Sequence, residues 1–222
     1  MKKVLLVLIF ISNIVFGQEK VSQNVGDFNE LKIYRGLEVE LIKSNDQKVI
    51  VEGEKSEEVI IKNINGVLKI SMTVLETFSA HQAKVTVYFK EDLDIIDVNE
   101  GAVINSKETF KQDKIVIKAQ EAGMVDLKVK TTDLDVKIVT GGIITLNGTS
   151  KNQNVKVNTG GIYKAENLET DYTNISASTG ASATVYATKL VDANANLGAT
   201  ITIKGEPEEI KRKESIGGYI RE

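Results

Sequence analysis

Four aspartates are the candidates for catalytic carboxylates in this chain: Asp126, Asp133, Asp135 and Asp171. Hydrolysis of a polysaccharide needs two carboxylic acids that converge on one groove. In an extended chain, Asp133 and Asp135 point to the same side. The residues that align with this pair in the following segments are Asn154 and Asn174, so no cluster of carboxylates is predicted. The sequence therefore predicts that the protein is not an enzyme, with a polysaccharide-active lyase or hydrolase as the alternative.

Other kinds of catalysis find less support. The chain has no cysteine and a single histidine, His81, in the segment FSAHQAK, which does not supply the ligands of a structural zinc site. The repeated Thr-Gly-Gly-Ile lacks the Lys-Ser/Thr of a phosphate-binding loop and does not open a helix. No catalytic, metal-binding or cofactor-binding residue is predicted, and no cofactor. Whether calcium binds through carboxylates and carbonyls stays open.

Three lysines recur at an interval of 19 residues: Lys118, Lys137 and Lys156. If segments of that length stack, their side chains lie roughly 4.8 Å apart on one outward surface. Like charges at that distance repel by roughly 1 kcal/mol per pair in water. Such a stripe would suit an acidic glycan or a lipopolysaccharide phosphate. The alternative is a solvated face on which the lysine stems shield the sheet.

The interval belongs to a longer repeat, marked by small residues at Ala102, Gly123, Gly142, Gly161, Ala181 and Ala199. Positions two and four places after each mark, and four and six places before it, are almost all apolar. Positions three places after and five before are polar in each repeat. This alternation with a period of two is the pattern of a β-strand.

A repeat of about 20 residues is typical of a solenoid. The predicted fold is therefore all-β, a parallel β-helix in which each coil stacks on the next and buries ladders of Ile, Val and Leu. Glycine suits the sharp corner because it reaches positive φ without a Cβ clash. Thr140, Thr159 and Thr179 are predicted to stack at this corner and to pass hydroxyl hydrogen bonds between coils.

The chain divides into four predicted parts. Residues 1–17 combine Met-Lys-Lys, an apolar run and Gly17, the layout of a secretory signal peptide. Residues 18–95 are irregular N-terminal β coils of the same domain, with a separate small β-sandwich as the alternative. Residues 96–205 are regular coils, and 206–222 form a charged tail. Its charges and the single proline would protect an open sheet edge from aggregation.

The signal peptide predicts export through the inner membrane, to the periplasm, the outer-membrane surface or the medium. No second apolar run is present, so no transmembrane segment is predicted. The net charge is −3 and falls to −5 once the two lysines of residues 1–17 leave. An acidic chain is a poor candidate for binding nucleic acid.

The order of several motifs resembles a known family. The segments FNELKIYRGLEVELI, VEGEKSEEVI, NGVLKISM and NEGAVIN, followed by the TGGI coils, are similar to the putative auto-transporter adhesin head GIN domain family. The resemblance runs from about Phe28 to Gly205, with the Gly-Ile-Asn signature replaced by Gly-Ala-Val-Ile-Asn at 101–105. It implies a right-handed β-helix of pectin-lyase-like architecture and an adhesive role at the cell surface. It carries over no catalytic residues.

We therefore expect an exported, non-catalytic binding protein of the cell envelope, of the adhesin type. Its expected partner is a cell-surface glycan or an envelope protein, and a structural module that forms homo-oligomers is a further alternative. The contact residues expected from the sequence are Lys118, Lys137 and Lys156. Platforms for stacking on sugars are few, with Tyr163, Tyr172 and Tyr186 in the repeat region.

Overall fold

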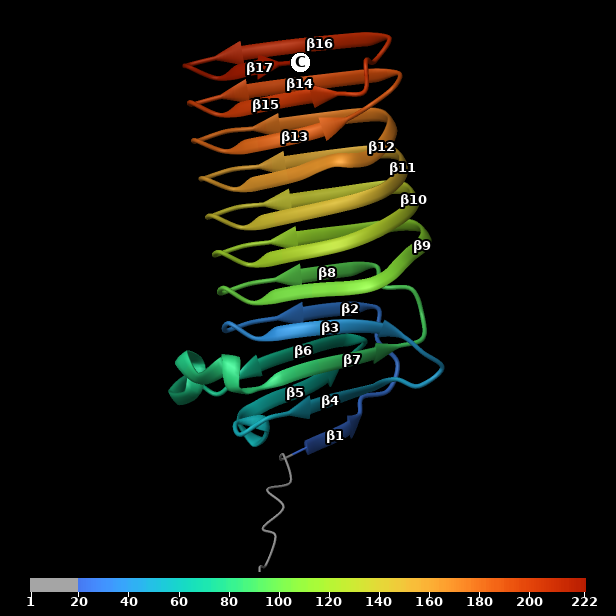
Figure 1. Cartoon of the computed structure of the whole chain (residues 1–222), viewed down its shortest axis with the longest axis vertical. Helices are drawn as coiled ribbons and strands as arrows, with labels where there is room; N and C mark the ends of the chain where they lie inside the picture. The colour runs from blue at the N-terminus through green and yellow to red at the C-terminus, as the bar shows by residue number, and fades with distance from the viewer. Residues whose placement is uncertain (1–19) are drawn as a thin grey trace, which may run out of the picture.

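The computed structural model describes residues 20–222, and the predicted signal peptide lies outside this part of the chain. The fold is a parallel β-solenoid of about seven turns with coils of about 19 residues, which confirms the predicted β-helix. Figure 1 shows the coils stacked in one column, each closed by a narrow turn on one side and a wide bend on the other.

The N-terminal part contains β1 (Lys20–Asn24), β2 (Glu30–Ile33), β3 (Glu38–Lys43), β4 (Lys48–Glu52), η1 (Ser56–Glu58), β5 (Val59–Ile64), β6 (Val67–Met72), η2 (Val74–Gln82) and β7 (Lys84–Phe89), where η denotes a 3-10 segment. The following coils contain β8 (Ile95–Val98), β9 (Val103–Ala119), β10 (Met124–Ile138), β11 (Ile143–Val157), β12 (Ile162–Ala177), β13 (Ser182–Tyr186), β14 (Leu190–Asn196) and β15 (Thr200–Lys204). The chain finishes with β16 (Glu209–Ser215) and β17 (Tyr219–Arg221).

Strand pairing divides the solenoid into two faces, here called sheet I and sheet II. Sheet I runs through β1, β4, β7, β3, the first halves of β9–β12, then β13, β15 and β17. Sheet II runs through β5, β6, β2, β8, the second halves of β9–β12, then β14 and β16. Strands β9–β12 bend from one sheet into the other, so residues 19 to 21 apart in these strands lie side by side.

The narrow turn depends on glycine for two different reasons. Thr140 and Gly141 both have positive φ, at 50° and 71°, a conformation that glycine adopts without strain. Gly142 follows where the chain passes close to the preceding coil, and a Cβ there would lie 2.4 Å from the Ala119 carbonyl oxygen. The predicted role of glycine at this corner is confirmed.

The hydrogen-bond ladder at this turn differs from the prediction. The backbone N–H of Gly141 donates to the carbonyl oxygen of Thr159 at 3.0 Å, and Gly160 donates to Thr179 at 3.0 Å. Backbone groups link the coils here because the left-handed turn directs an N–H along the solenoid axis toward the next carbonyl. The predicted ladder of threonine hydroxyls is replaced by this backbone ladder.

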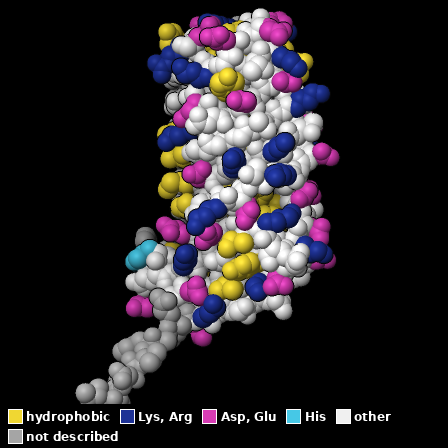
Figure 2. Space-filling model, turned by 45° about the vertical axis from the view of Figure 1, so that its right-hand side comes forward, with side chains coloured by type: hydrophobic (Ala, Val, Ile, Leu, Met, Phe, Trp, Pro, Cys, Tyr) yellow, Lys and Arg dark blue, Asp and Glu magenta, His cyan; other side chains and the backbone are white. Residues whose placement is uncertain are grey.

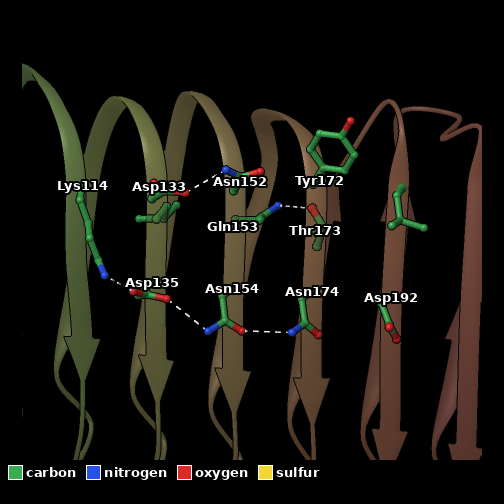
Figure 3. A pocket seen from close by; sticks show the side chains of 12 residues that line it. Lys114, Asp133, Asp135, Asn152, Gln153, Asn154, Tyr172, Thr173, Asn174 and Asp192 are labelled. Carbon is green, nitrogen blue, oxygen red and sulfur yellow. Dashed lines mark hydrogen bonds and ion pairs between the residues drawn. The ribbon is translucent and has the colours of Figure 1, made fainter.

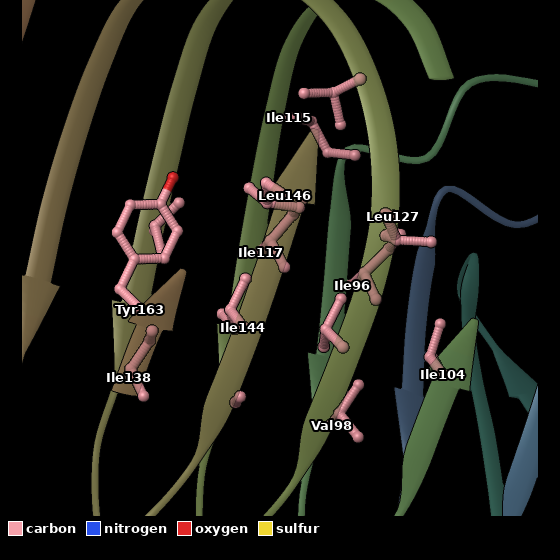
Figure 4. Close-up of a cluster of buried hydrophobic side chains, with 14 of the residues drawn as sticks. Ile96, Val98, Ile104, Ile115, Ile117, Leu127, Ile138, Ile144, Leu146 and Tyr163 are labelled. Atoms are coloured by element: carbon pink, nitrogen blue, oxygen red, sulfur yellow. The ribbon is translucent and has the colours of Figure 1, made fainter. Parts of the chain in front are cut away.

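The core consists of the aliphatic ladders that the repeat predicts. Figure 4 shows Ile96 and Ile117 in sheet II, and Ile104 and Ile144 in sheet I, all turned into the space between the sheets. Each of these side chains is fully buried. Burial of a side chain of this size contributes about 1.5–3 kcal/mol, so the stacked coils hold the fold without disulfides.

Two adjacent coils replace apolar core residues by a buried polar network. The ring of Tyr163 stands in an aliphatic ladder, and its hydroxyl donates to Gln153 Oε1 at 3.0 Å. Gln153 Nε2 donates in turn to the hydroxyl of Thr173 at 2.8 Å. A buried hydroxyl needs such a partner, and Ala183 beside the ring in the next coil leaves room for it.

The two ends of the solenoid are built differently. At the N-terminal end, β4 and β5 pair antiparallel with β7 and β6, and β1 adds to β4. At the C-terminal end, the structure folds residues 209–221, which the sequence placed in a charged tail, as one more coil. Its core-side positions include Ile210 and Ile220, but also Arg212 and Glu214, which align with Ala193 and Ala195 of the preceding coil.

Candidate functional site on sheet II

Sheet II carries two of the candidate aspartates, Asp133 and Asp135 in the second half of β10, on its outward surface. Asp133 aligns with Asn152, and Asp135 aligns with Asn154, whose own neighbour in the next coil is Asn174. The expectation that amides, and not carboxylates, surround Asp135 is therefore confirmed. The amide next to Asp133 is that of Asn152, and not that of Asn154 or Asn174 as the sequence predicted.

The other two candidate aspartates lie elsewhere. Asp126 is in the first half of β10, on sheet I. Asp171 lies in β12 next to Lys189, whose Nζ is 2.8 Å from its carboxylate, and this hydrogen bond lowers the pKa of Asp171. The structure therefore does not bring the four predicted carboxylates together. The single histidine, His81, lies in η2, outside sheet II.

Hydrogen bonds connect the outward side chains of sheet II from coil to coil (Figure 3). Lys114 Nζ lies 3.4 Å from the carboxylate of Asp135. Asn154 Nδ2 donates to Asp135 at 3.2 Å, and Asn174 Nδ2 donates to Asn154 Oδ1 at 3.5 Å. A neighbouring row begins where Asn152 Nδ2 donates to Asp133 at 2.8 Å. The rows hold the polar groups in fixed orientations while leaving acceptor lone pairs open to solvent.

These rows line a shallow pocket with a volume of about 490 Å³. It extends across the second halves of β9–β12 and β14, with side chains from five successive coils: Lys114, Asp133, Leu134, Asp135, Asn152, Gln153, Asn154, Tyr172, Thr173, Asn174, Leu190 and Asp192. Carboxylate, amide and ammonium groups stand beside one aromatic ring. This combination can hydrogen-bond the hydroxyls of a ligand and pack against an apolar ring face.

Of the three tyrosines in the repeat region, Tyr172 presents the exposed ring at this pocket. Tyr172 is 40% exposed, whereas Tyr163 is 1% exposed and belongs to the core. Tyr186 is half-buried in β13, on sheet I. Lys189 Nζ lies 5.5 Å from the centre of the Tyr172 ring, and this cation–π contact holds the ring in place.

Sequence reasoning missed Asn152 and Asp192 as members of the site. Asp192 aligns with Asn174 in register, so it continues the row of Asp135 and Asn154. The sequence signal for Asp192 is the set of positions two residues before each lysine of the row, which Asp135 and Asn154 also occupy. That column is mixed in the sequence, because the first coil has Val116 there.

The three predicted lysines stack as expected. Lys118 pairs in register with Lys137, and Lys137 pairs with Lys156. Lys137 and Lys156 are exposed and Lys118 is half-buried. The row lies on sheet II two residues along each strand from the row of Asp135 and Asn154, so both rows share one outward surface. Their role in binding a ligand stays a prediction.

Comparison with solved structures supports the fold. The chain is similar to a putative adhesin from Bacteroides fragilis, with a TM-score of 0.84, 19% identity and coverage of 93% of this chain and 97% of that chain. It is also similar to a putative lipid binding protein from Parabacteroides distasonis (TM-score 0.74, 16% identity, 94% and 98% coverage). A putative adhesin from Parabacteroides merdae gives a TM-score of 0.72 at 16% identity, with 94% and 97% coverage.

Among curated proteins, none matches this chain. Within residues 20–222, no helix has the length and apolar character that crossing a membrane requires. A family model described as putative auto-transporter adhesin, head GIN domain, matches residues 27–207. The chain therefore belongs to the auto-transporter adhesin head GIN domain family.

Proposed function

We propose that this protein is an exported, non-catalytic binding protein of the cell envelope that holds a polysaccharide on sheet II and acts in adhesion. Family membership supports an adhesin-type role. The single observation that carries the proposal is the sheet II pocket, in which rows of Asp and Asn stand beside the exposed ring of Tyr172. The family and the predicted signal peptide both support the proposed location at the envelope.

The chemistry of the pocket suits a sugar ring. A pyranose presents hydroxyls at its edge and C–H groups on its faces, so it needs directed hydrogen bonds together with a flat apolar partner. Asp192 and Asn174 offer acceptors and donors at one side of the pocket, and Tyr172 offers the ring at the other (Figure 3). Because the rows repeat with the coils, successive sugars of one chain can meet similar groups.

The pocket is less suited to hydrolysis. The carboxylates of Asp133 and Asp135 both accept hydrogen bonds from asparagine amides, at 2.8 and 3.2 Å. A glycosidase needs two carboxylic acids that face one glycosidic bond, whereas the groups that contact these two carboxylates from the next coil are amides. This supports a binding role over the alternative of a polysaccharide-active enzyme.

The test is a glycan array probed with residues 18–222 and with a Tyr172→Ala variant. The variant should lose most binding, because a stacked aromatic ring contributes about 0.5–1.5 kcal/mol beyond its buried area. Tyr219→Ala is the matched control, since Tyr219 is 57% exposed on sheet I. Equal loss in both variants, or no binding by the wild type, would overturn the proposal. Release of reducing ends from a bound polysaccharide would favour the enzyme.

A further inference from the structure

The lysine row of sheet II is longer than the repeat predicted. In the antiparallel N-terminal part, Lys62 of β5 lies directly opposite Lys69 of β6, and Lys69 pairs in register with Lys32 of β2. Lys32 then pairs with Asp97, and Asp97 with Lys118. The lysine column of sheet II therefore comprises Lys62, Lys69, Lys32, Lys118, Lys137 and Lys156.

The column crosses seven adjacent strands, so it extends for roughly 29 Å at about 4.8 Å per strand. Asp97 is its one interruption, and this side chain is largely buried, at 8% exposure. The carboxylate of Asp97 accepts hydrogen bonds from Asn99 Nδ2 and Gln120 Nε2, both at 3.0 Å. It is thus held by neighbouring amides beneath the surface, and the ammonium groups form the outermost layer.

The described residues leave most of this charge uncompensated. Lys32 lies 3.5 Å from Glu30, whereas no carboxylate of residues 20–222 lies within ion-pair distance of the other five lysines. Like charges directly opposite each other destabilise a sheet. A column that serves only solubility would alternate the two signs, and opposite charges do lie close together on the side of the molecule seen in Figure 2. The column therefore has a cost that stability does not explain.

We propose that the lysine column binds a linear acidic polysaccharide that lies along the solenoid axis, with an anionic group on successive sugars. This inference rests on the proposed function and names the class of its ligand. The column is one side chain wide. Its flanking positions carry no further lysine: they are Asn154 and Asn158 beside Lys156, Asp135 and Val139 beside Lys137, and Val116 and Gln120 beside Lys118. A single line of charge matches one polymer chain, whereas a membrane surface would be met by a broad basic patch.

The Asp and Asn rows supply the second half of the site. They lie on the same surface, two residues along each strand from the regular half of the column. A polysaccharide on this line can direct its anionic groups to the lysines and its hydroxyls to the pocket with Tyr172. The N-terminal half of the column extends the contact beyond the pocket by four more strands, β8, β2, β6 and β5, of which the last three carry a lysine.

The experiment measures binding of oligogalacturonates of increasing length to three triple variants by calorimetry at several salt concentrations. The first is Lys32→Gln, Lys62→Gln, Lys69→Gln, and the second is Lys118→Gln, Lys137→Gln, Lys156→Gln. The control is Lys128→Gln, Lys130→Gln, Lys164→Gln, which removes the same charge from exposed lysines of β10 and β12 on sheet I. The fully methyl-esterified oligomer and anionic lipid vesicles complete the set.

Each column variant should bind the long acid oligomer roughly threefold to a hundredfold more weakly than the wild type, with a smaller salt dependence. It should also melt at a higher temperature, which excludes misfolding as the cause. The first variant should bind short oligomers like the wild type, and its affinity should not rise further as the oligomers become longer. The control should bind like the wild type, and the esterified oligomer should bind weakly to every form.

Three results would overturn the inference. They are equal affinity and salt dependence in the column variants and the wild type, equal weakening in the control, and tighter binding to vesicles than to the oligomer. If neutral glycans bind the pocket, and the acid oligomers bind the column variants as tightly as the wild type, only this inference fails. If no glycan of either kind binds the wild type, the proposed function fails as well.

Discussion

At the residue scale, the narrow turn of one coil carries an uncommon substitution. Where other coils have glycine, such as Gly101 at φ 71° and Gly160 at φ 67°, the β9–β10 turn has Ala122 at φ 62°. A residue with a Cβ pays roughly 1–2 kcal/mol in this left-handed conformation. The backbone therefore stores strain at Ala122 that glycine would release.

Ala122→Gly should raise the free energy of unfolding by about 0.5–1 kcal/mol, because the released strain exceeds the entropy that glycine adds to the unfolded chain. Ala102→Gly is the control, since Ala102 is buried and does not have positive φ; it should destabilise the protein by about 1 kcal/mol. Urea denaturation measures both. A destabilising Ala122→Gly would show that the turn is not strained.

Tyr163 gives a second prediction at this scale, through its buried hydroxyl. Burial raises the pKa of Tyr163. In the unfolded chain a tyrosine ionises near pH 10, so above that pH the unfolded state releases a proton that the folded state keeps. Stability then falls as the pH rises above about 10. Tyr163→Phe should cost about 1–3 kcal/mol at neutral pH, because Gln153 loses its donor.

The measurement is the free energy of unfolding of wild type and Tyr163→Phe at about pH 9 and pH 11. The wild type should lose about 1.4 kcal/mol more than the variant over this interval, the value of one pH unit for one proton. The comparison cancels the tyrosines and lysines that both proteins share. Parallel losses in the two proteins would mean that Tyr163 titrates normally.

At the element scale, the strands of the regular coils were predictable from the sequence and the ends of the solenoid were not. Alternating columns such as Ile96, Ile117 and Val136 need only the local pattern, because each coil repeats the contacts of its neighbour. The antiparallel pairing of β4 with β7 and of β5 with β6 depends on long-range contacts without a period. For the same reason, Lys62 and Lys69 escaped detection as members of the lysine column.

The candidate site divides in the same way. Lys118, Lys137 and Lys156 share an offset in the repeat, so their stacking followed from counting. Tyr172 aligns with Asn152 because of a one-residue bulge between β11 and β12, and it aligns with Leu190 because the following coil is shorter. Exposure separates Tyr172 from Tyr163. Tyr163 stands in an apolar column of the repeat, whereas Tyr172 lies outside the alternating columns, so the pattern does not predict its exposure.

The final coil leads to a prediction about association. Two of its core-side positions hold charged residues: Arg212, which is paired with the Glu222 carboxylate, and Glu214, whose carboxylate accepts the N–H of Ile220 at 2.5 Å. Inward-pointing charges at an open edge oppose edge-to-edge pairing. Replacing them by apolar residues should therefore allow the C-terminal ends of two molecules to associate.

The variant Arg212→Leu, Glu214→Val should form dimers or larger species in size-exclusion chromatography with light scattering. The control Glu209→Val, Lys211→Leu makes the same change of charge at two outward positions of the same strand, β16. It should associate less than the core-side variant. If the core-side variant stays at the size of the wild type, then these charges do not cap the solenoid. If both variants associate equally, hydrophobicity alone is the cause.

At the scale of the whole molecule, stacking converts a short sequence repeat into long, straight rows of identical groups. The apolar rows form the core (Figure 4), and the outward rows of sheet II form a surface that is regular along the solenoid axis. A polymer ligand is the natural counterpart of such a surface, since both repeat in one direction. This correspondence unites the pocket, the lysine column and the adhesin family in one account.

The most direct test of this account labels the lysine ammonium groups with 13C-methyl groups and follows their NMR signals during titration with a long oligogalacturonate. Methylation keeps the charge. The account predicts that the signals of Lys32, Lys62, Lys69, Lys118, Lys137 and Lys156 shift together, while those of Lys128, Lys130 and Lys164 on sheet I stay in place. Shifts that are confined to sheet I, or spread evenly over all lysines, would contradict it.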